Sequence, residues 1–245
     1  MLEVRDLRKA FGGFEAVGGV SLSVAAGQVT AIIGPNGAGK TTLFNLITGH
    51  VRPDAGAVRF DGRDITGLAP HDVCRLGVGR SFQRTNIFPR LTVFQNVQAA
   101  FISHRRRGLD LFTPVDRLYR DETQALLASL GLLDRSGEMS GFLSHGAQKQ
   151  LELGIALASE PRLLLLDEPT AGMSAVETRD TIRLISRIAR ERGLTLLFTE
   201  HDMEVVFSIA QTITVLHQGR VIAGGTPAEV RGDPEVRRVY LGERR

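Results

Sequence analysis

The residues with the clearest chemistry form the glycine-rich stretch Gly34-Pro35-Asn36-Gly37-Ala38-Gly39-Lys40-Thr41-Thr42. It fits the pattern G-x-x-x-x-G-K-[ST], the P-loop that wraps a phosphate chain. Glycines let successive backbone N–H groups point at one phosphate, and the N-terminus of a following helix adds partial positive charge. Lys40 would reach the β- and γ-phosphates, and the Thr41 hydroxyl would ligate Mg²⁺. The stretch therefore predicts a nucleoside triphosphate site.

The flanking residues supply the context that such a loop needs. Residues 29–33 form a short apolar, β-branched run, which predicts a buried strand, and residues 42–47 predict the first turns of a helix. A strand, a phosphate-binding loop and a helix thus follow one another. A P-loop by itself indicates nucleotide binding, and the rest of the chain must indicate which kind.

Two acids, Asp167 and Glu168, close a run of four leucines at residues 163–166. A continuous apolar run is typical of a central parallel strand, whose carboxyl end lies at the ligand crevice. There Asp167 can hold Mg²⁺ through coordinated water. Adjacent side chains of a strand point to opposite sides, so Glu168 would point toward the place where an attacking water could lie.

Gln83 and His201 each stand at the end of a further predicted strand, on the same edge of the crevice. Gln83 could ligate the metal and sense the γ-phosphate, and His201 could donate a hydrogen bond to a γ-phosphate oxygen. Considered alone, a residue of either type at such a position is more often an ordinary loop residue. The other histidines show no metal-ligand spacing.

A second anion-binding helix N-terminus is predicted around Ser144. Ser144 can cap a helix that begins near Ala147, and Gly146 lies in the same turn. A chain that binds one nucleotide needs no second phosphate site. A dimer does, if the serine–glycine turn of each copy covers the γ-phosphate of the other.

With these residues in place, the chain resembles an ATPase subunit of the ABC type over essentially its whole length. The most specific part is Leu143–Gly146, which resembles the LSGGQ signature of that family. There are two departures: His145 replaces the first glycine, and Ala147 stands where glutamine is usual, with Gln148 one place later. Ser144 and Gly146, the positions that touch phosphate in the family, are kept.

The resemblance implies ATP and Mg²⁺ as cofactors and assigns roles to individual residues. Phe11, which could instead be a core aromatic, matches the adenine-stacking ring, Glu168 the general base and His201 the switch histidine. Residues 171–174 match a loop that contacts the second subunit. The implied catalytic residues are Glu168, His201, Lys40 and Gln83, the ATP contacts are Phe11, Gly34, Asn36, Gly37, Gly39, Lys40, Thr41, Thr42, Ser144 and Gly146, and the metal ligands are Thr41, Gln83 and Asp167.

Residues 82–93 and the ending at 239–243 resemble the ATPases of branched-chain amino acid importers and of related urea and short-amide importers. In those systems two ATPase subunits, identical or paralogous, lie under two integral-membrane permease subunits, and a periplasmic or extracellular solute-binding protein delivers the solute. The resemblance is specific for the importer class. It is weak for the solute, which the ATPase never touches.

The pattern of elements predicts an α/β fold in a single nucleotide-binding domain. Short β-like pieces in residues 1–26 predict an N-terminal antiparallel β subdomain, and Asp61-Gly62 predicts a hairpin within residues 58–65. Residues 87–154 read as an inserted α-helical subdomain, in which the spacing of apolar residues predicts a helix over 121–133. The core would comprise residues 1–86 and 155–245. The resemblance implies that this core is a RecA-like P-loop NTPase.

Composition narrows the function further. The net charge of +3 is spread over the chain except at residues 105–107, so no nucleic-acid role is expected. That arginine triplet is either solvated or in contact with lipid head groups or an acidic partner. No membrane span or signal peptide is predicted, which favours a cytoplasmic protein. The resemblance to importer ATPases implies that it is peripheral on the inner face of the membrane. The single cysteine, Cys74, excludes an internal disulfide.

Three other functions remain to be weighed against a transporter subunit. A soluble ABC ATPase acting on nucleic acid or ribosomes would be longer and carry a basic stripe. A GTPase or kinase would leave the Ser144 turn unexplained, and the chain has no Asn-Lys-x-Asp guanine motif. A catalytically inactive module is disfavoured because Glu168 and His201 are both present.

Overall fold

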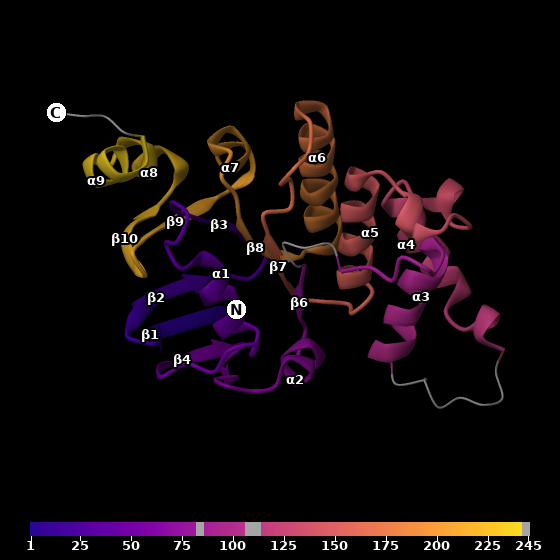
Figure 1. The fold of residues 1–245 in the computed structure, drawn as a ribbon, viewed down its shortest axis with the longest axis horizontal. Coiled ribbons are helices and arrows are strands. Elements are labelled where there is room, and N and C mark those ends of the chain that lie inside the picture. Colours follow the sequence, from indigo (N-terminus) through magenta and orange to yellow (C-terminus); the bar gives the residue numbers. More distant parts are fainter. Residues whose placement is uncertain (82–85, 106–113, 242–245) are drawn as a thin grey trace.

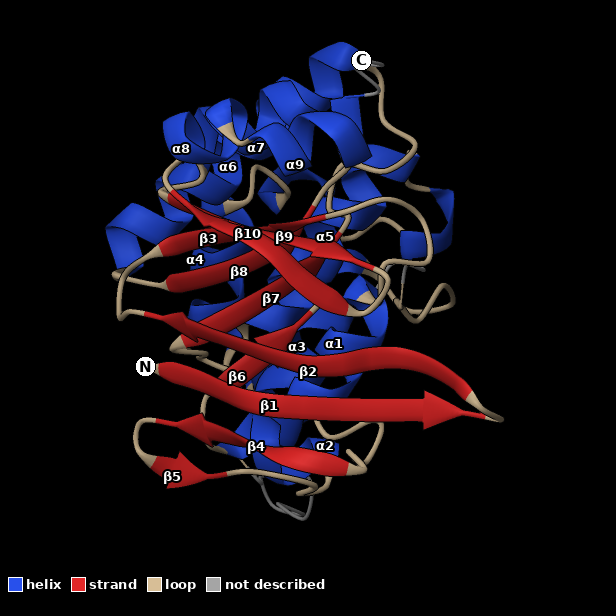
Figure 2. Ribbon diagram, turned by 90° about the vertical axis from the view of Figure 1, so that its left-hand side faces the viewer, coloured by secondary structure: helices blue, strands red, loops and turns tan. Residues whose placement is uncertain are grey.

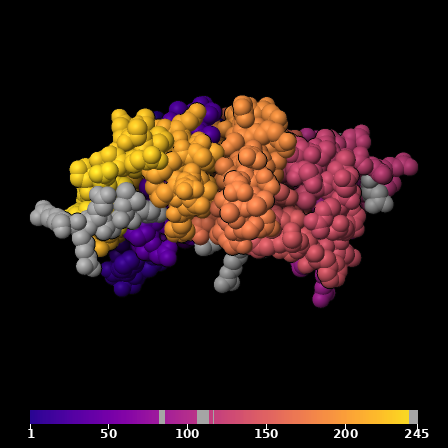
Figure 3. Space-filling view, turned by 90° about the horizontal axis from the view of Figure 1, so that it is seen from above, coloured from indigo at the N-terminus to yellow at the C-terminus, as the bar shows by residue number. Residues whose placement is uncertain are grey.

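The computed structural model describes residues 1–81, 86–105 and 114–241. It contains two β-sheets, with helices between and around them (Figures 1 and 2). In Figure 2 the smaller sheet lies mostly below the larger one. Viewed from above, the molecule is elongated, with the C-terminal helices at one end and the helices of residues 93–157 at the other (Figure 3). No helix in the described part of the chain is both long and apolar enough to span a bilayer.

The larger sheet has six strands in the order β10-β9-β3-β8-β7-β6. Its strands are β3 (Val29–Ile33), β6 (Val78–Arg80), β7 (Leu163–Asp167), β8 (Thr195–Thr199), β9 (Thr212–His217) and β10 (Arg220–Gly225). All neighbouring pairs are parallel except β9 and β10, which form an antiparallel hairpin. The carboxyl ends of β3, β7 and β8 therefore lie at one edge.

The smaller sheet is antiparallel and has the order β2-β1-β4-β5. Its strands are β1 (Leu2–Phe11), β2 (Phe14–Val24), β4 (Ala55–Phe60) and β5 (Arg63–Asp64). β4 and β5 turn at Asp61 and Gly62, both of which have positive φ (49° and 77°). This is the conformation that an Asp-Gly hairpin turn adopts, so the predicted hairpin is present.

The helices lie between the sheets, along the top, at the right-hand end and at the bottom of the molecule (Figure 1). They are α1 (Lys40–Ile47), α2 (Pro70–Arg75), α3 (Val93–His104), α4 (Arg120–Ser129), α5 (His145–Leu157), α6 (Ala175–Arg192), α7 (Met203–Ile209), α8 (Pro227–Gly232) and α9 (Pro234–Val236). Three 3₁₀ turns cover Val115–Arg117, Leu133–Arg135 and Ser140–Phe142, and a π-helical turn covers Arg237–Leu241.

The central strands are apolar on both faces because each face packs into a different core. Leu164 and Leu166 of β7 belong to a buried cluster with residues of α3 to α7. Leu163 and Leu165 belong to a second cluster, with residues of α1 and of the antiparallel sheet. Side chains alternate along a strand, so the uninterrupted leucine run places a carboxylate pair at the end of a strand that is covered on both sides.

Three helices differ in their bounds from the sequence prediction. The helix predicted over 121–133 ends at Ser129, because Gly131 turns the chain with a φ of 71°, and the separate turn Leu133–Arg135 follows. The P-loop helix begins at Lys40, two residues earlier than predicted, since Gly39 caps it with a φ of 101°. α5 extends to Leu157, past the predicted end of the helical insertion. The division into a core and an inserted subdomain stays a prediction.

Candidate functional site

The glycine-rich loop joins β3 to α1 and lines a cavity of about 270 Å³. Residues 36–42 form one wall, and Phe14, Ala16 and Glu168 complete the lining. The cavity thus brings together the predicted P-loop, one predicted acid and two residues of the β1–β2 hairpin.

Gly39 shows why a glycine is needed in this loop. Its φ of 101° is one that other residues rarely adopt, and a Cβ atom on it would lie 2.4 Å from the carbonyl oxygen of Ala16. The loop is therefore pressed against β2 at this position. This contact also places Ala16 beside the cavity.

Lys40 is buried, with 6% of its surface exposed, although its type and charge favour solvent. Its Nζ donates to the carbonyl oxygens of Gly34, at 2.6 Å, and of Pro35, at 3.2 Å. Burial lowers the pKa of Lys40, while the carboxylates of Glu168 and Asp167 act in the opposite direction. The ammonium group is thus held within the phosphate-binding loop and close to both acids.

Asp167 ends β7 opposite Thr199, the last residue of β8. Its carboxylate is 1% exposed, and its Oδ1 accepts a 2.8 Å hydrogen bond from Oγ1 of Thr199. The same threonine receives the backbone N–H of Glu168, with N–O distances of 3.2 Å to its carbonyl and 3.1 Å to its hydroxyl. One side chain of the neighbouring strand therefore orients both acids.

Glu168 adopts a φ of 50°, which is uncommon for a residue with a side chain. Such strain persists where surrounding contacts impose it, and it concentrates at functional positions. Oε1 of Glu168 lies 2.6 Å from Nε2 of His201, the residue predicted to sense the γ-phosphate. The structure therefore brings the two predicted catalytic side chains together beside the P-loop cavity.

Glu200 fixes the loops that follow β7 and β8 relative to each other. Its buried carboxylate accepts from the backbone N of Thr170 at 2.9 Å and from the Thr170 hydroxyl at 2.6 Å. Glu200 directly precedes His201, and these hydrogen bonds tie it to Thr170 in the loop that follows Glu168. The pair of loops is held by side-chain hydrogen bonds as well as by the sheet.

Ser144 caps α5, as predicted, and its hydroxyl accepts a hydrogen bond from the backbone N of Ala147 at 3.4 Å. The turn packs against the segment after β7: a Cβ on Gly172 would lie 3.4 Å from the His145 ring, and one on Gly146 3.0 Å from Glu177. Among the described residues, neither Ser144 nor Gly146 lines the P-loop cavity. A single chain thus does not join the two predicted phosphate sites.

Comparison with known proteins decides the family. A family model described as ABC transporter matches residues 17–171, and one described as branched-chain amino acid ATP-binding cassette transporter matches residues 220–245. This chain belongs to the ABC transporter family. The family resemblance predicted from the residues, and with it the ATPase class, is confirmed.

Several curated ABC proteins are similar over the full length of the chain. BraF of Pseudomonas aeruginosa, a high-affinity branched-chain amino acid transport ATP-binding protein, is 41% identical, with 99% of this chain and 98% of the relative covered. LivG of Escherichia coli, of the same description, is 37% identical with the same coverage. LptB of Haemophilus influenzae, a lipopolysaccharide export system ATP-binding protein, is 35% identical, again with 99% and 98% covered.

Solved ABC structures confirm the predicted fold class. A nucleotide-free ATP-binding cassette from an ABC transporter superposes with a TM-score of 0.85 at 31% identity, with 99% of both chains covered. The ADP conformation of MJ1267, another ATP-binding cassette, gives 0.84 at 32% identity and the same coverage. The core is therefore that of a P-loop NTPase of the ABC type.

Phe11 of this ABC ATPase lies at the end of β1 and is 48% exposed, so the alternative of a core aromatic is wrong. Its partner across the hairpin is Phe14, which is 64% exposed and lines the P-loop cavity. Directly opposite residues of an antiparallel pair share a face, and Ala16, two residues along β2, shares it too. Phe14 was not among the predicted site residues. Its position directly after the turn residues Gly12-Gly13 was the available signal.

Magnesium fits the residues that the structure places near the loop. Mg²⁺ prefers oxygen ligands and is usually bound by one or two protein groups together with phosphates and water. Thr41 offers a hydroxyl at the start of α1 and Asp167 a carboxylate at the end of β7. The described residues contain no group of three or more His, Cys, Asp or Glu side chains that could hold a metal without such help. The third predicted ligand, Gln83, lies outside the described residues.

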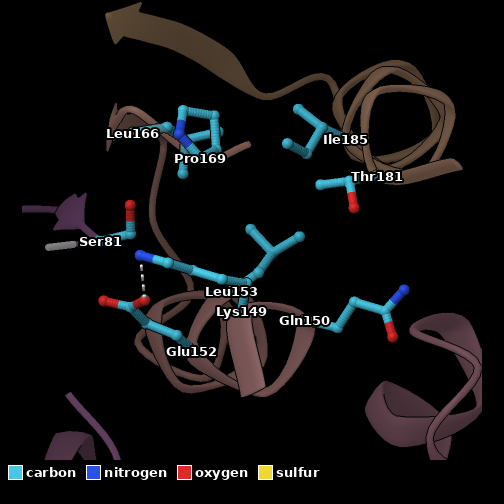
Figure 4. Close-up of a pocket in the computed structure, with 9 residues that line it drawn as sticks. All are labelled: Ser81, Lys149, Gln150, Glu152, Leu153, Leu166, Pro169, Thr181 and Ile185. Carbon is cyan, nitrogen blue, oxygen red and sulfur yellow. Dashed lines mark hydrogen bonds and ion pairs between the residues drawn. The ribbon is translucent and has the colours of Figure 1, made fainter. Parts of the chain in front are cut away.

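A second, small cavity of about 20 Å³ lies where α5 and α6 meet the ends of β6 and β7 (Figure 4). On its α5 side Nζ of Lys149 lies 3.3 Å from Oε2 of Glu152, and both side chains are about 5% exposed or less. Ser81, Leu166 and other residues of the core face them. α5, whose N-cap is Ser144, thus shares the lining of this cavity with Leu166, the residue before Asp167.

Proposed function

We propose that this chain hydrolyses ATP as the energy-coupling subunit of an importer for branched-chain amino acids or for related small polar solutes such as urea and short amides. The observation that carries the catalytic part is the 2.6 Å contact between Glu168 and His201 beside the P-loop cavity. The import part is supported by the family match at residues 220–245 and by the similarity to BraF and LivG.

In the proposed reaction, the P-loop amides and the N-terminus of α1 bind the phosphates of ATP. Lys40 exchanges the neutral carbonyl oxygens of Gly34 and Pro35 for phosphate oxygens, so that its ammonium group is paired with negative charge. Glu168 takes a proton from the attacking water as the new P–O bond forms and the bond to the β-phosphate oxygen breaks. His201 donates a hydrogen bond to the γ-phosphate.

Thr41, Asp167 and Gln83 are the residues that would hold Mg²⁺. When bound, the ion neutralises charge on the β- and γ-phosphates. Thr199 prepares Asp167 for this role, because its 2.8 Å hydrogen bond fixes one carboxylate oxygen.

The second phosphate site, at Ser144 and Gly146, would serve the ATP of another ATPase subunit, either a second copy or a paralogue. Two nucleotides would then lie between two subunits, and closure of this dimer would drive two integral-membrane permease subunits between their inward- and outward-facing states. A solute-binding protein outside the membrane would deliver the solute. The chain itself would lie on the cytoplasmic face.

The test is co-expression with permease and binding-protein subunits of a branched-chain amino acid importer, followed by purification and reconstitution into liposomes. We expect the permeases to co-purify with this chain. ATP hydrolysis should rise when the binding protein carries leucine, isoleucine or valine, or instead urea or a short amide. A complex that carries Glu168→Gln is the control. Co-purification with ribosomes or nucleic acid, or stimulation by lipopolysaccharide, would overturn the proposal.

A further inference from the structure

Arg80 is the last residue of β6, and its charged side chain is buried, with 6% of it exposed. One arm of its guanidinium, Nη1, donates to Oδ1 of Asn45 at 2.7 Å and to Oγ1 of Thr48 at 2.9 Å. Its other arm, Nη2, lies 3.5 Å from Oδ2 of Asp167. The guanidinium therefore spans from the P-loop helix and its C-cap to the acid at the end of β7.

The two oxygens of Asp167 are oriented from opposite sides. Oδ1 accepts from Thr199 of β8 at 2.8 Å, and Oδ2 faces Arg80 of β6. The 3.5 Å separation is at the limit of a hydrogen bond, so charge attraction is the main contribution of Arg80 here. Burial lowers the pKa of Arg80, but an arginine stays protonated in proteins. The neighbouring strands thus hold the carboxylate with a fixed positive charge and a hydroxyl.

We propose that Arg80 is a positioning residue for magnesium: it orients the Asp167 carboxylate toward the metal and couples it to the P-loop helix through Asn45 and Thr48. The inference rests on the proposed function, since it assigns Asp167 to Mg²⁺. A planar fork can serve Asp167 with one arm and α1 with the other, whereas a lysine ammonium is a single point charge.

Partners that orient a metal ligand contribute strongly to metal affinity, and their loss typically costs about 10- to 100-fold. Arg80→Lys keeps the charge and loses the fork. We therefore expect it to lower the metal-dependent part of nucleotide affinity by about tenfold. Affinity for ATP without metal should stay at the wild-type value, because the P-loop is unchanged.

The experiment measures binding of a fluorescent ATP analogue to the purified chain in EDTA and in a Mg²⁺ titration. The quantity compared between variants is the ratio of the affinity in Mg²⁺ to the affinity in EDTA. Asn45→Ala, which keeps the guanidinium but removes one of its anchors, should lower the ratio in the same direction. Arg162→Lys is the matched control. Arg162 directly precedes β7, at the opposite end from Asp167, and pairs with Asp61.

The outcomes separate this inference from the function on which it rests. A wild-type chain without metal-dependent nucleotide binding would refute the proposed function. A wild-type ratio retained in Arg80→Lys and Asn45→Ala, or tighter metal binding in either, would overturn the inference alone. Equal losses in EDTA and in Mg²⁺ would assign Arg80 a purely structural role and would overturn it as well.

Discussion

Oε1 of Glu168 lies 2.6 Å from Nε2 of His201, although the two residues are 33 positions apart in the chain. They are adjacent because β7 and β8 are parallel neighbours, with Asp167 opposite Thr199. Glu168 directly follows the last residue of β7, and His201 lies two positions after the last residue of β8. The pairing of two buried strands thus places a candidate base beside a candidate γ-phosphate sensor.

Glu168→Gln should leave ATP binding intact and slow hydrolysis by about 10²- to 10⁴-fold, because glutamine keeps the shape of the side chain but cannot accept a proton. Lys40 and the P-loop are unchanged, so ATP-bound dimers should accumulate. Steady-state hydrolysis and size-exclusion chromatography with ATP measure both effects. Glu191→Gln, at an exposed position of α6, is the control. Turnover near the wild-type rate would remove Glu168 from its role as the base.

His201→Ala should also slow hydrolysis, and its effect should not add to that of Glu168→Gln. Residues that act as one unit in catalysis give strongly non-additive losses. Their 2.6 Å contact makes such coupling the expected result. The rates of both single variants and the double variant decide it. A double variant that is slower than the worse single variant by the full effect of the other would show that the two residues act independently.

Much of the fold could be predicted because its signals are local. The strand, loop and helix of residues 29–47 are contiguous, and the leucine run at 163–166 is apolar on both faces, which only a central strand explains. Helix ends were less accurate, as at Gly131, since a glycine inside a helical pattern is compatible with either continuation or termination.

The parts of the site that the sequence did not reveal depend on distant pairings. Thr199 and Arg80 contact Asp167 across 32 and 87 positions, and nothing in the immediate neighbourhood of either residue indicates that contact. An arginine before a loop is usually solvated, so the buried position of Arg80 requires knowledge of strand order. His201, in contrast, ends a strand next to β7, and strand-end polar residues are a usable signal.

Ser144→Arg should abolish hydrolysis by the dimer and leave the ATP affinity of the isolated chain near the wild-type value. Ser144 caps α5 and, among the described residues, is not part of the P-loop cavity of its own chain. A bulky cation there would block only the nucleotide of a partner subunit. Fluorescent-nucleotide binding and hydrolysis measure the two effects, with Ser103→Arg, at an exposed position of α3, as the control. Loss of ATP affinity in the isolated chain would mean that Ser144 acts within one chain.

Phe14→Ala should weaken ATP binding as much as Phe11→Ala does. The two rings lie opposite each other on one face of the β1–β2 hairpin, and Phe14 lines the P-loop cavity. Stacking of a base on an aromatic ring contributes about 1–3 kcal/mol, so each variant should lose about 5- to 140-fold in affinity for ATP.

Tripolyphosphate, which lacks a base, separates this effect from damage to the loop. Both variants should bind it as the wild type does, because Lys40 and residues 34–42 are unaltered. Phe142→Ala, which removes an 87% exposed ring that is not part of the P-loop cavity lining, should leave both affinities unchanged. If Phe14→Ala bound ATP as tightly as the wild type while Phe11→Ala did not, the base would stack on Phe11 alone, and the cavity face of Phe14 would contribute nothing to nucleotide recognition.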